Sequence, residues 1–190
     1  FRVPSHLDGS RGAYRQPQAL CLLSATNDYE AILTWLRSKH GLTPEQRVDR
    51  MKRRKQRDAG VPTGLEWLSA LSHTQRAYRK EAERFLLWAI LERGKALSSM
   101  TQEDCIAYRE FISDPQPRST WCGSRARERW SPLWRPFEGP LSTTAQQHAI
   151  TILKNLYRYL VDQNYLVGNP WSSVQVPRSS TPKVDAGRSF

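Results

Sequence analysis

The segment from Ser72 to Gly94 reads SHTQRAYRKEAERFLLWAILERG, and this stretch decides the fold class. Ser72 and Gln75 have the spacing of a capping box, in which each side chain accepts a hydrogen bond from the other residue's backbone N–H, and Gly94 is a common helix terminator. Apolar residues recur every three or four positions between these signals, which predicts one long helix with a buried seam. The seam residues are Tyr78, Ala82, Phe85, Leu86 and Ala89, and the basic residues Arg76, Arg79, Lys80 and Arg84 fall outside it.

Three further segments carry helix signals of the same kind. One helix can begin at Asn27 with Glu30, and another at Thr101 with Asp104. The last helix begins at the Ser-Thr-Thr run at 142–144. No segment alternates apolar and polar residues as a half-buried strand would. We therefore expect an all-α fold, a bundle of four to five helices.

The chain outside these helices divides into four stretches. Residues 1–24 mix Pro, Gly and Ser without periodicity and predict an extended N-terminal arm, while residues 173–190 are rich in Ser, Pro and charge and predict a linker. The stretches 41–71 and 114–140 interrupt the helices and are interpreted as insertions. This leaves 25–172 as the single central domain.

The first insertion carries most of its charge in one run. Seven of the eleven residues from Arg47 to Arg57 are Arg or Lys, following a helix-start signal at Thr43 and Gln46. Too few apolar residues are present to hold such a helix by burial. The run is either a solvated excursion or a segment that orders on phosphate.

The second insertion combines aromatic and basic residues. It contains five Pro, three Trp and five Arg. We expect Trp121, Trp130 and Trp134 to be buried against the bundle, while their neighbours offer guanidinium groups to a backbone phosphate. Those neighbours are Arg125, Arg127 and Arg129.

The overall charge favours a polyanionic partner. The chain has 190 residues with 29 Lys and Arg against 18 Asp and Glu, a net charge of +11. Much of the excess lies in 41–60 (7 − 3 = +4) and 73–95 (6 − 3 = +3), which is the pattern of a nucleic-acid binder. A merely solubilising basic surface and a helical module that binds an acidic protein remain the alternatives.

Several other classes are disfavoured. No apolar run approaches the roughly 20 residues of a membrane span, so we expect a soluble protein without a membrane partner. The three Cys stand 84 and 17 positions apart and the four His are scattered, which predicts neither disulfides nor a metal site and favours the reducing cytoplasm. No phosphate-binding glycine loop or nucleophile elbow is present, and we expect no cofactor and no small-molecule substrate.

Taken together, the segments carry a family resemblance. Residues 72–85 resemble the second helix of the core-binding, SAM-like domain of tyrosine site-specific recombinases, the phage integrase family. The stretches LKNLYRYLV at 153–161 and YLVGNP at 165–170 are similar to that domain's last helix and its Asn-Pro exit. The third helix is matched by Leu97, Thr101, Glu103, Asp104 and Tyr108.

The resemblance implies a SAM-like bundle that forms one jaw of a clamp on double-stranded DNA, with its second and last helices facing the major groove. It implies DNA integration and site-specific recombination in the bacterial cytoplasm, at the nucleoid, with other recombinase protomers meeting on DNA as a tetramer. A stand-alone DNA-binding adaptor is the alternative. The implied contacts on the second helix are Thr74, Arg76, Arg79, Lys80 and Arg84.

The last helix departs from the family pattern. The family often has a Thr and paired Arg near its start, where this chain has Ala145 followed by Gln146, Gln147 and His148. Glutamine can pair with adenine edges, so these three residues are candidates for base readout. Lys154 and Arg158 are the further candidates on this helix.

Family members cleave DNA with residues of a separate C-terminal domain, and we expect no catalytic residue between Phe1 and Phe190. His73 and Arg76 spell the family's His-x-x-Arg pattern, and Tyr108 follows 32 residues later. However, the pair lies inside the helix assigned to DNA binding, and Tyr108 occupies a predicted core position.

Overall fold

The computed structural model describes residues 2–39, 46 and 65–178, and this part of the chain is helical. It contains five α-helices and no strand, which confirms the all-α prediction. Within the same ranges, no helix combines the length and apolar character that a bilayer span requires. The predicted helix start at 43–45 and the basic run at 47–57 lie outside the described residues. The α-helices are α1 (Asp28–Arg37), α3 (His73–Arg93), α4 (Gln102–Ser113), α5 (Arg118–Trp121) and α6 (Thr143–Asp162).

The chain forms two compact units. The first, here called the helical body, consists of residues 1–108 and 152–174, and the second unit consists of 109–151 and 175–190. Four short 3-10 turns belong to the helical body: η1 (Ser5–Leu7), η2 (Gln18–Leu20), η3 (Glu66–Ala70) and η4 (Leu97–Ser99).

Helix α3 forms as its sequence predicts. The Ser72 hydroxyl accepts a hydrogen bond from Gln75 N at 3.1 Å, and the Gln75 side chain accepts one from Ser72 N at 3.0 Å. At the other end Gly94 adopts the left-handed conformation, with φ at +59°. These caps satisfy backbone groups that the helix itself leaves unpaired.

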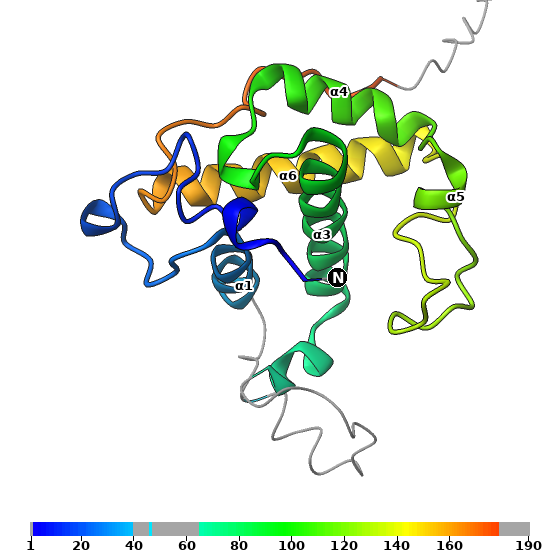
Figure 1. Cartoon of the computed structure of the whole chain (residues 1–190), viewed down its shortest axis with the longest axis horizontal. Helices are drawn as coiled ribbons and strands as arrows, with labels where there is room; N and C mark the ends of the chain where they lie inside the picture. The colour runs from blue at the N-terminus through cyan, green and yellow to red at the C-terminus, as the bar shows by residue number, and fades with distance from the viewer. Residues whose placement is uncertain (1, 40–45, 47–64, 179–190) are drawn as a thin grey trace, which may run out of the picture. The chain divides into compact units, whose positions relative to one another are not determined.

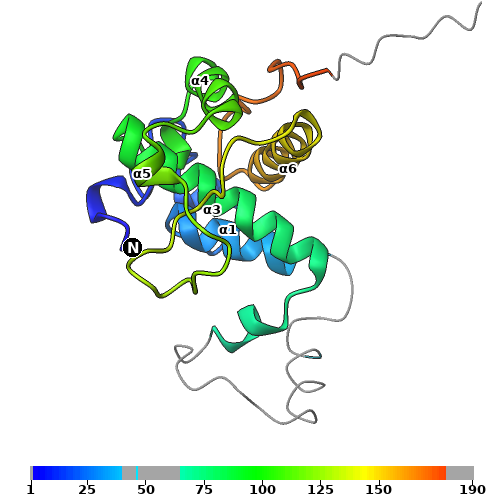
Figure 2. The ribbon, with the colours of Figure 1, turned by 90° about the vertical axis from the view of Figure 1, so that its right-hand side faces the viewer.

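Helix α1 runs beside α3 (Figures 1 and 2). Its start is capped by the Asn27 side chain, which accepts from Glu30 N at 2.9 Å. Glu30 also reaches back, but its carboxylate accepts from Thr26 N, one residue before the cap. Trp35 of α1 stacks on Tyr78 of α3 with ring centroids 5.1 Å apart, and this contact joins the two helices.

An aromatic cluster forms the centre of the helical body. Phe85 meets Tyr108 edge-on at 4.8 Å and Trp171 at 5.4 Å between ring centroids. Tyr157 of α6 also packs on Phe85, at 6.1 Å. Each such pair contributes about 1 kcal/mol beyond simple area burial. Trp171 follows the Asn-Pro exit of the last helix, so the core extends past that helix.

The N-terminal segment packs into the helical body, although the sequence predicts an extended arm there. Tyr14 N donates to Ser98 O, and Val167 N donates to Tyr14 O, at 3.1 and 3.0 Å. The Arg15 guanidinium lies 3.9 Å from the ring centroid of Tyr165. The Pro, Gly and Ser residues that suggest an arm instead allow irregular backbone to follow the surface of the bundle.

A buried carboxylate lies where this segment meets α1. Asp28 is 1% exposed. Tyr165 donates its hydroxyl to Asp28 Oδ1 at 2.7 Å, and Ser98 donates its N–H and hydroxyl to Oδ2 at 3.0 and 3.1 Å. Burial outweighs these hydrogen bonds and raises the pKa of Asp28 from 3.8 to about 6.

Because of Asp28, the free energy of unfolding is expected to decrease as the pH rises from 3.8 to about 6. In this interval the folded state keeps a proton that the unfolded state has lost, which lowers the free energy of unfolding by about 3 kcal/mol across the interval. Urea denaturation at several pH values measures the slope. Asp28→Asn does not titrate and should remove this decline, whereas an unchanged slope in the variant would contradict the assignment. The pKa of Asp104 is lowered to about 2, so its effect on stability lies at lower pH and has the opposite direction. The stability that Asp104 contributes is lost as the pH falls from 3.8 to about 2.

The second unit has its own small aromatic core. Phe111 packs edge-on against Trp121 at 5.1 Å and against Phe137 at 5.8 Å. Of the three tryptophans expected to be buried, Trp121 is buried and Trp134 is half-buried. The expectation is wrong for Trp130, which is 82% exposed.

Candidate nucleic-acid interface

The basic residues of α3 differ in exposure. Arg76 and Lys80 are exposed, as is Thr74 near the helix start. Arg79 is half-buried and forms an ion pair with Glu83, with 2.7 Å between Nε and Oε1. Burial lowers the pKa of Arg79 from its usual range. Thr74, Arg76 and Lys80 are therefore presented to solvent as the sequence predicts, while the charge of Arg79 is largely compensated.

Arg84 is a correction to the predicted DNA-contact face. It is 9% exposed, and its Nη1 lies 3.1 Å from Glu81 Oε1, which is itself buried. The reason is the surroundings of α3: beyond Lys80 the helix is buried on several sides, so a position outside one apolar seam still lies in the interior. The neighbouring buried residues are Glu81, Ala82, Phe85, Leu86, Trp88, Ala89 and Ile90.

Three helices of the body meet around one lysine. Lys39 Nζ, just past α1, donates to Asn155 Oδ1 of α6 at 2.7 Å, and Trp35 Nε1 donates to the same oxygen at 3.2 Å. The ammonium also lies 5.5 Å from the ring centroid of Trp35 and 5.7 Å from that of Tyr78. We call these four residues the Lys39 site. No carboxylate forms an ion pair with this ammonium among the described residues.

The Lys39 site is electrostatically suited to an anion. The site removes water from the ammonium, and this desolvation lowers the pKa of Lys39. An ammonium that has lost hydration and is held by a neutral amide gains more from an approaching anion than a fully hydrated one does. Sequence reasoning missed both Lys39 and Asn155, since a lysine just after a helix is commonly explained by the helix dipole.

Two predicted contact residues flank Asn155 on α6. Lys154 is half-buried, and Arg158 is exposed one turn further along. Within the described part of the chain, neither side chain makes a hydrogen bond or an ion pair. Within the described residues no carboxylate therefore pairs with either charge, and both residues lie within one helical turn of Asn155.

The predicted base-reading residues at the start of α6 belong to the second unit. Gln146 Nε2 donates to Leu141 O at 2.8 Å, and Gln147 Nε2 donates to Pro177 O at 2.5 Å. His148 is exposed. Each glutamine thus uses one amide N–H within its own unit.

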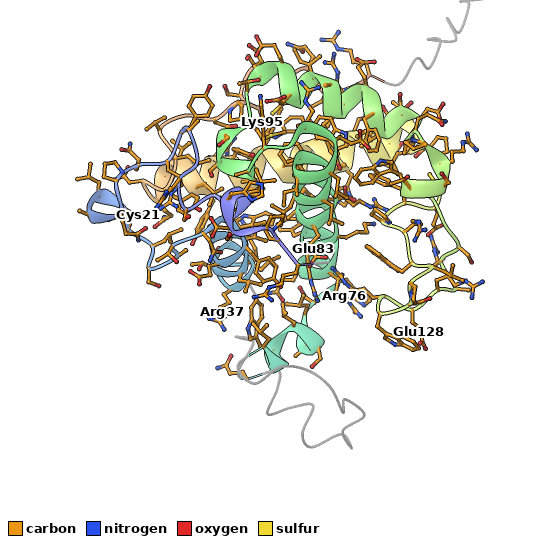
Figure 3. The ribbon with its side chains drawn as sticks, in the orientation of Figure 1. Cys21, Arg37, Arg76, Glu83, Lys95 and Glu128 are labelled. Carbon is orange, nitrogen blue, oxygen red and sulfur yellow. The ribbon has the colours of Figure 1, made fainter. Side chains whose placement is uncertain are left out.

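The end of the helical body where α1 stops and α3 starts also carries cations (Figure 3). Arg37 lies over the ring of Trp67, with 4.6 Å from its guanidinium carbon to the centroid, and Arg76 lies 3.3 Å from His73 Nδ1. The stretch 41–60, which follows Lys39 closely in the sequence, carries a net charge of +4.

The His-x-x-Arg pattern does not form a site with Tyr108. His73 and Arg76 are exposed at the start of α3, whereas Tyr108 is fully buried between Phe85 and Trp88. Burial raises the pKa of Tyr108 well above 10. This agrees with the predicted core position of Tyr108.

Metal ligation has no support in the described chain. Among residues 2–39, 46 and 65–178, no three side chains of His, Cys, Asp or Glu gather as a metal site would require.

Comparisons with protein-family models, with curated proteins and with solved structures find no match to this chain.

Proposed function

We propose that this protein binds double-stranded DNA through the surface around the Lys39 site. By its resemblance it acts as the core-binding domain of a tyrosine recombinase, in DNA integration and site-specific recombination. It meets other recombinase protomers on DNA, and the cleavage chemistry belongs to a separate domain.

The observation that carries the proposal is the placement of Lys39, Lys154 and Arg158. Lys39 donates to Asn155, and Lys154 and Arg158 flank that residue on α6. By contrast, Arg79, Arg93 and Lys95 each form an ion pair with a carboxylate at 2.7 or 2.8 Å. Cations without a carboxylate partner are those that gain most from a phosphate.

The proposed contact set also follows from exposure. Thr74, Arg76 and Lys80 remain candidates on α3 because they are exposed, and Arg84 is withdrawn because it is buried. Lys39 is added. The resemblance assigns DNA contact to the second and last helices, which here are α3 and α6, and both contribute to the Lys39 site through Tyr78 and Asn155.

The double variant Lys154→Gln with Arg158→Gln is expected to weaken duplex binding and reduce its salt dependence. Each lost phosphate contact lowers the slope of log affinity against log salt by about 1, so the slope should fall by about 2. Fluorescence anisotropy with a labelled random duplex of about 20 base pairs, titrated across a range of salt, measures both quantities.

The matched control is Arg2→Gln with Arg11→Gln, which removes the same charge from two exposed positions of the N-terminal segment. The control should retain the wild-type slope. If both double variants lowered the slope equally, net charge alone would explain the effect, and the surface around the Lys39 site would not be the duplex-binding site. Absence of duplex binding at physiological salt, with retained binding to an acidic protein, would favour the protein-interaction alternative instead.

Selection from a random-sequence duplex pool tests the recombinase part of the proposal. A core-binding domain positions cleavage at a defined site, so we expect one sequence motif to be enriched. Binding without enrichment would argue for a non-specific DNA adaptor.

A further inference from the structure

The second unit holds a loop, residues 124–136, whose ends are fixed together. Gly123 N donates to Phe137 O at 2.8 Å, and Phe137 N donates to Trp121 O at 3.0 Å. Trp121 and Phe137 are both buried and pack against Phe111. The loop follows α5 in the chain (Figure 1).

The inside of this loop is ordered by hydrogen bonds rather than by an apolar core. The Arg135 guanidinium donates to the carbonyl oxygens of Ser119, Pro132 and Trp134 at 2.9, 3.0 and 2.8 Å. A Cβ at Gly123 would lie 3.0 Å from Arg135 Cγ, so the glycine leaves room for the arginine stem. Arg135 therefore holds the backbone in one shape.

This ordered loop presents apolar side chains to solvent. Trp130 is 82% exposed and Leu133 is 56% exposed. Exposed indole is costly in water, and tryptophan is enriched where proteins bind partners. The base of the loop has a small aromatic core, in which Trp121 and Phe137 are buried. The exposure of Trp130 therefore does not result from the absence of a core in this unit.

The charge around Trp130 indicates the chemistry of the partner. Residues 124–136 contain four Arg and one Glu, a net charge of 4 − 1 = +3. Arg127 is exposed, and Arg129 lies over the ring of Trp134 at 5.5 Å. Arg125 is paired with Glu138 at 2.5 Å and contributes less.

We propose that this loop binds a nucleic-acid strand with unpaired bases, with Trp130 stacked on a base and Arg127 and Arg129 facing the flanking phosphates. Bases with flat apolar faces on an anionic backbone match an exposed indole that closely follows two arginines in the chain. An acidic peptide offers the charge but not the flat face. A membrane surface needs a wider apolar face than Trp130 and Leu133 supply.

The inference goes beyond duplex binding by the helical body and stands on different residues. In the whole chain, Trp130→Ala is expected to weaken binding of labelled single-stranded oligothymidylate by about tenfold, the effect of losing one stacked base. Trp130→Phe should retain most of the affinity because phenylalanine also stacks. Tyr14→Ala removes another exposed aromatic ring and is the matched control.

An abasic oligonucleotide of the same length separates stacking from charge. If Trp130 stacks on a base, Trp130→Ala and wild type should bind the abasic strand equally. The inference would be overturned if Trp130→Ala also lost tenfold affinity for the abasic strand, or if it lost no affinity for oligothymidylate. It would equally be overturned if the wild-type protein did not bind oligothymidylate, or if polyglutamate competed with oligothymidylate equally well. The variant at Lys154 and Arg158 tests duplex binding alone, so the two proposals fail independently.

Discussion

Replacing Gly9 by alanine is expected to lower the free energy of unfolding by about 3 kcal/mol. Gly9 has φ at +83°, a conformation that alanine adopts only with strain. A Cβ at this position would also lie 2.0 Å from the carboxyl carbon of Asp28. Asp28 cannot move aside cheaply, because Tyr165 and Ser98 hold its carboxylate.

Gly94→Ala is the matched control for backbone strain alone. Gly94 also has a positive φ, at +59°, but apart from the local backbone no atom lies within 4 Å of the place that an alanine methyl group would take there. We expect a loss of about 1 kcal/mol for this variant. Urea denaturation followed by circular dichroism compares the two variants. If they lose the same amount, the close packing between Gly9 and Asp28 does not contribute to stability.

The second large effect is expected from Arg84→Gln, which leaves the Glu81 carboxylate buried without this arginine. Breaking a buried ion pair from one side costs about 3 kcal/mol or more. Lys80→Gln, on the exposed side of the same helix, should change stability by less than about 0.5 kcal/mol. Thermal unfolding of both variants measures the difference.

The double variant Glu81→Gln with Arg84→Gln completes the test. Removing both charges leaves no buried carboxylate that has lost its arginine, so the double variant should be more stable than Arg84→Gln alone. If Arg84→Gln melts at the wild-type temperature, Arg84 lies on the surface after all, and it returns to the DNA-contact face that the sequence suggests.

Local signals in the sequence are sufficient to place α1, α3, α4 and α6, but not the short α5, which lies in the stretch 114–140 interpreted as an insertion. The boxes at Ser72 and Thr101, the cap at Asn27 and the terminator Gly94 act through hydrogen bonds within a few residues, and each lies where the sequence predicts it. Such interactions depend on neighbours in the chain, so a single sequence reveals them.

Features that depend on distant residues are not predictable in the same way. The burial of Arg84 depends on how many elements pack around α3, and the packing of the N-terminal segment depends on Ser98 and Tyr165. Lys39 becomes a candidate contact only because Asn155, far away in the chain, lies beside it. Exposure of Trp130 likewise follows from a loop shape set by Arg135, which composition alone does not indicate.

The pairing of Tyr14 with Val167 has a consequence for the order in which the body folds. The helices α1 and α3 can meet early, since their contacts are relatively close in sequence. The contacts of Tyr14 and Arg15 with Val167 and Tyr165 cannot form until those two late residues have been made, although the contacts of the segment with Asp28 and Ser98 can form earlier. During synthesis, therefore, the pairing of Tyr14 with Val167 is a late, long-range step.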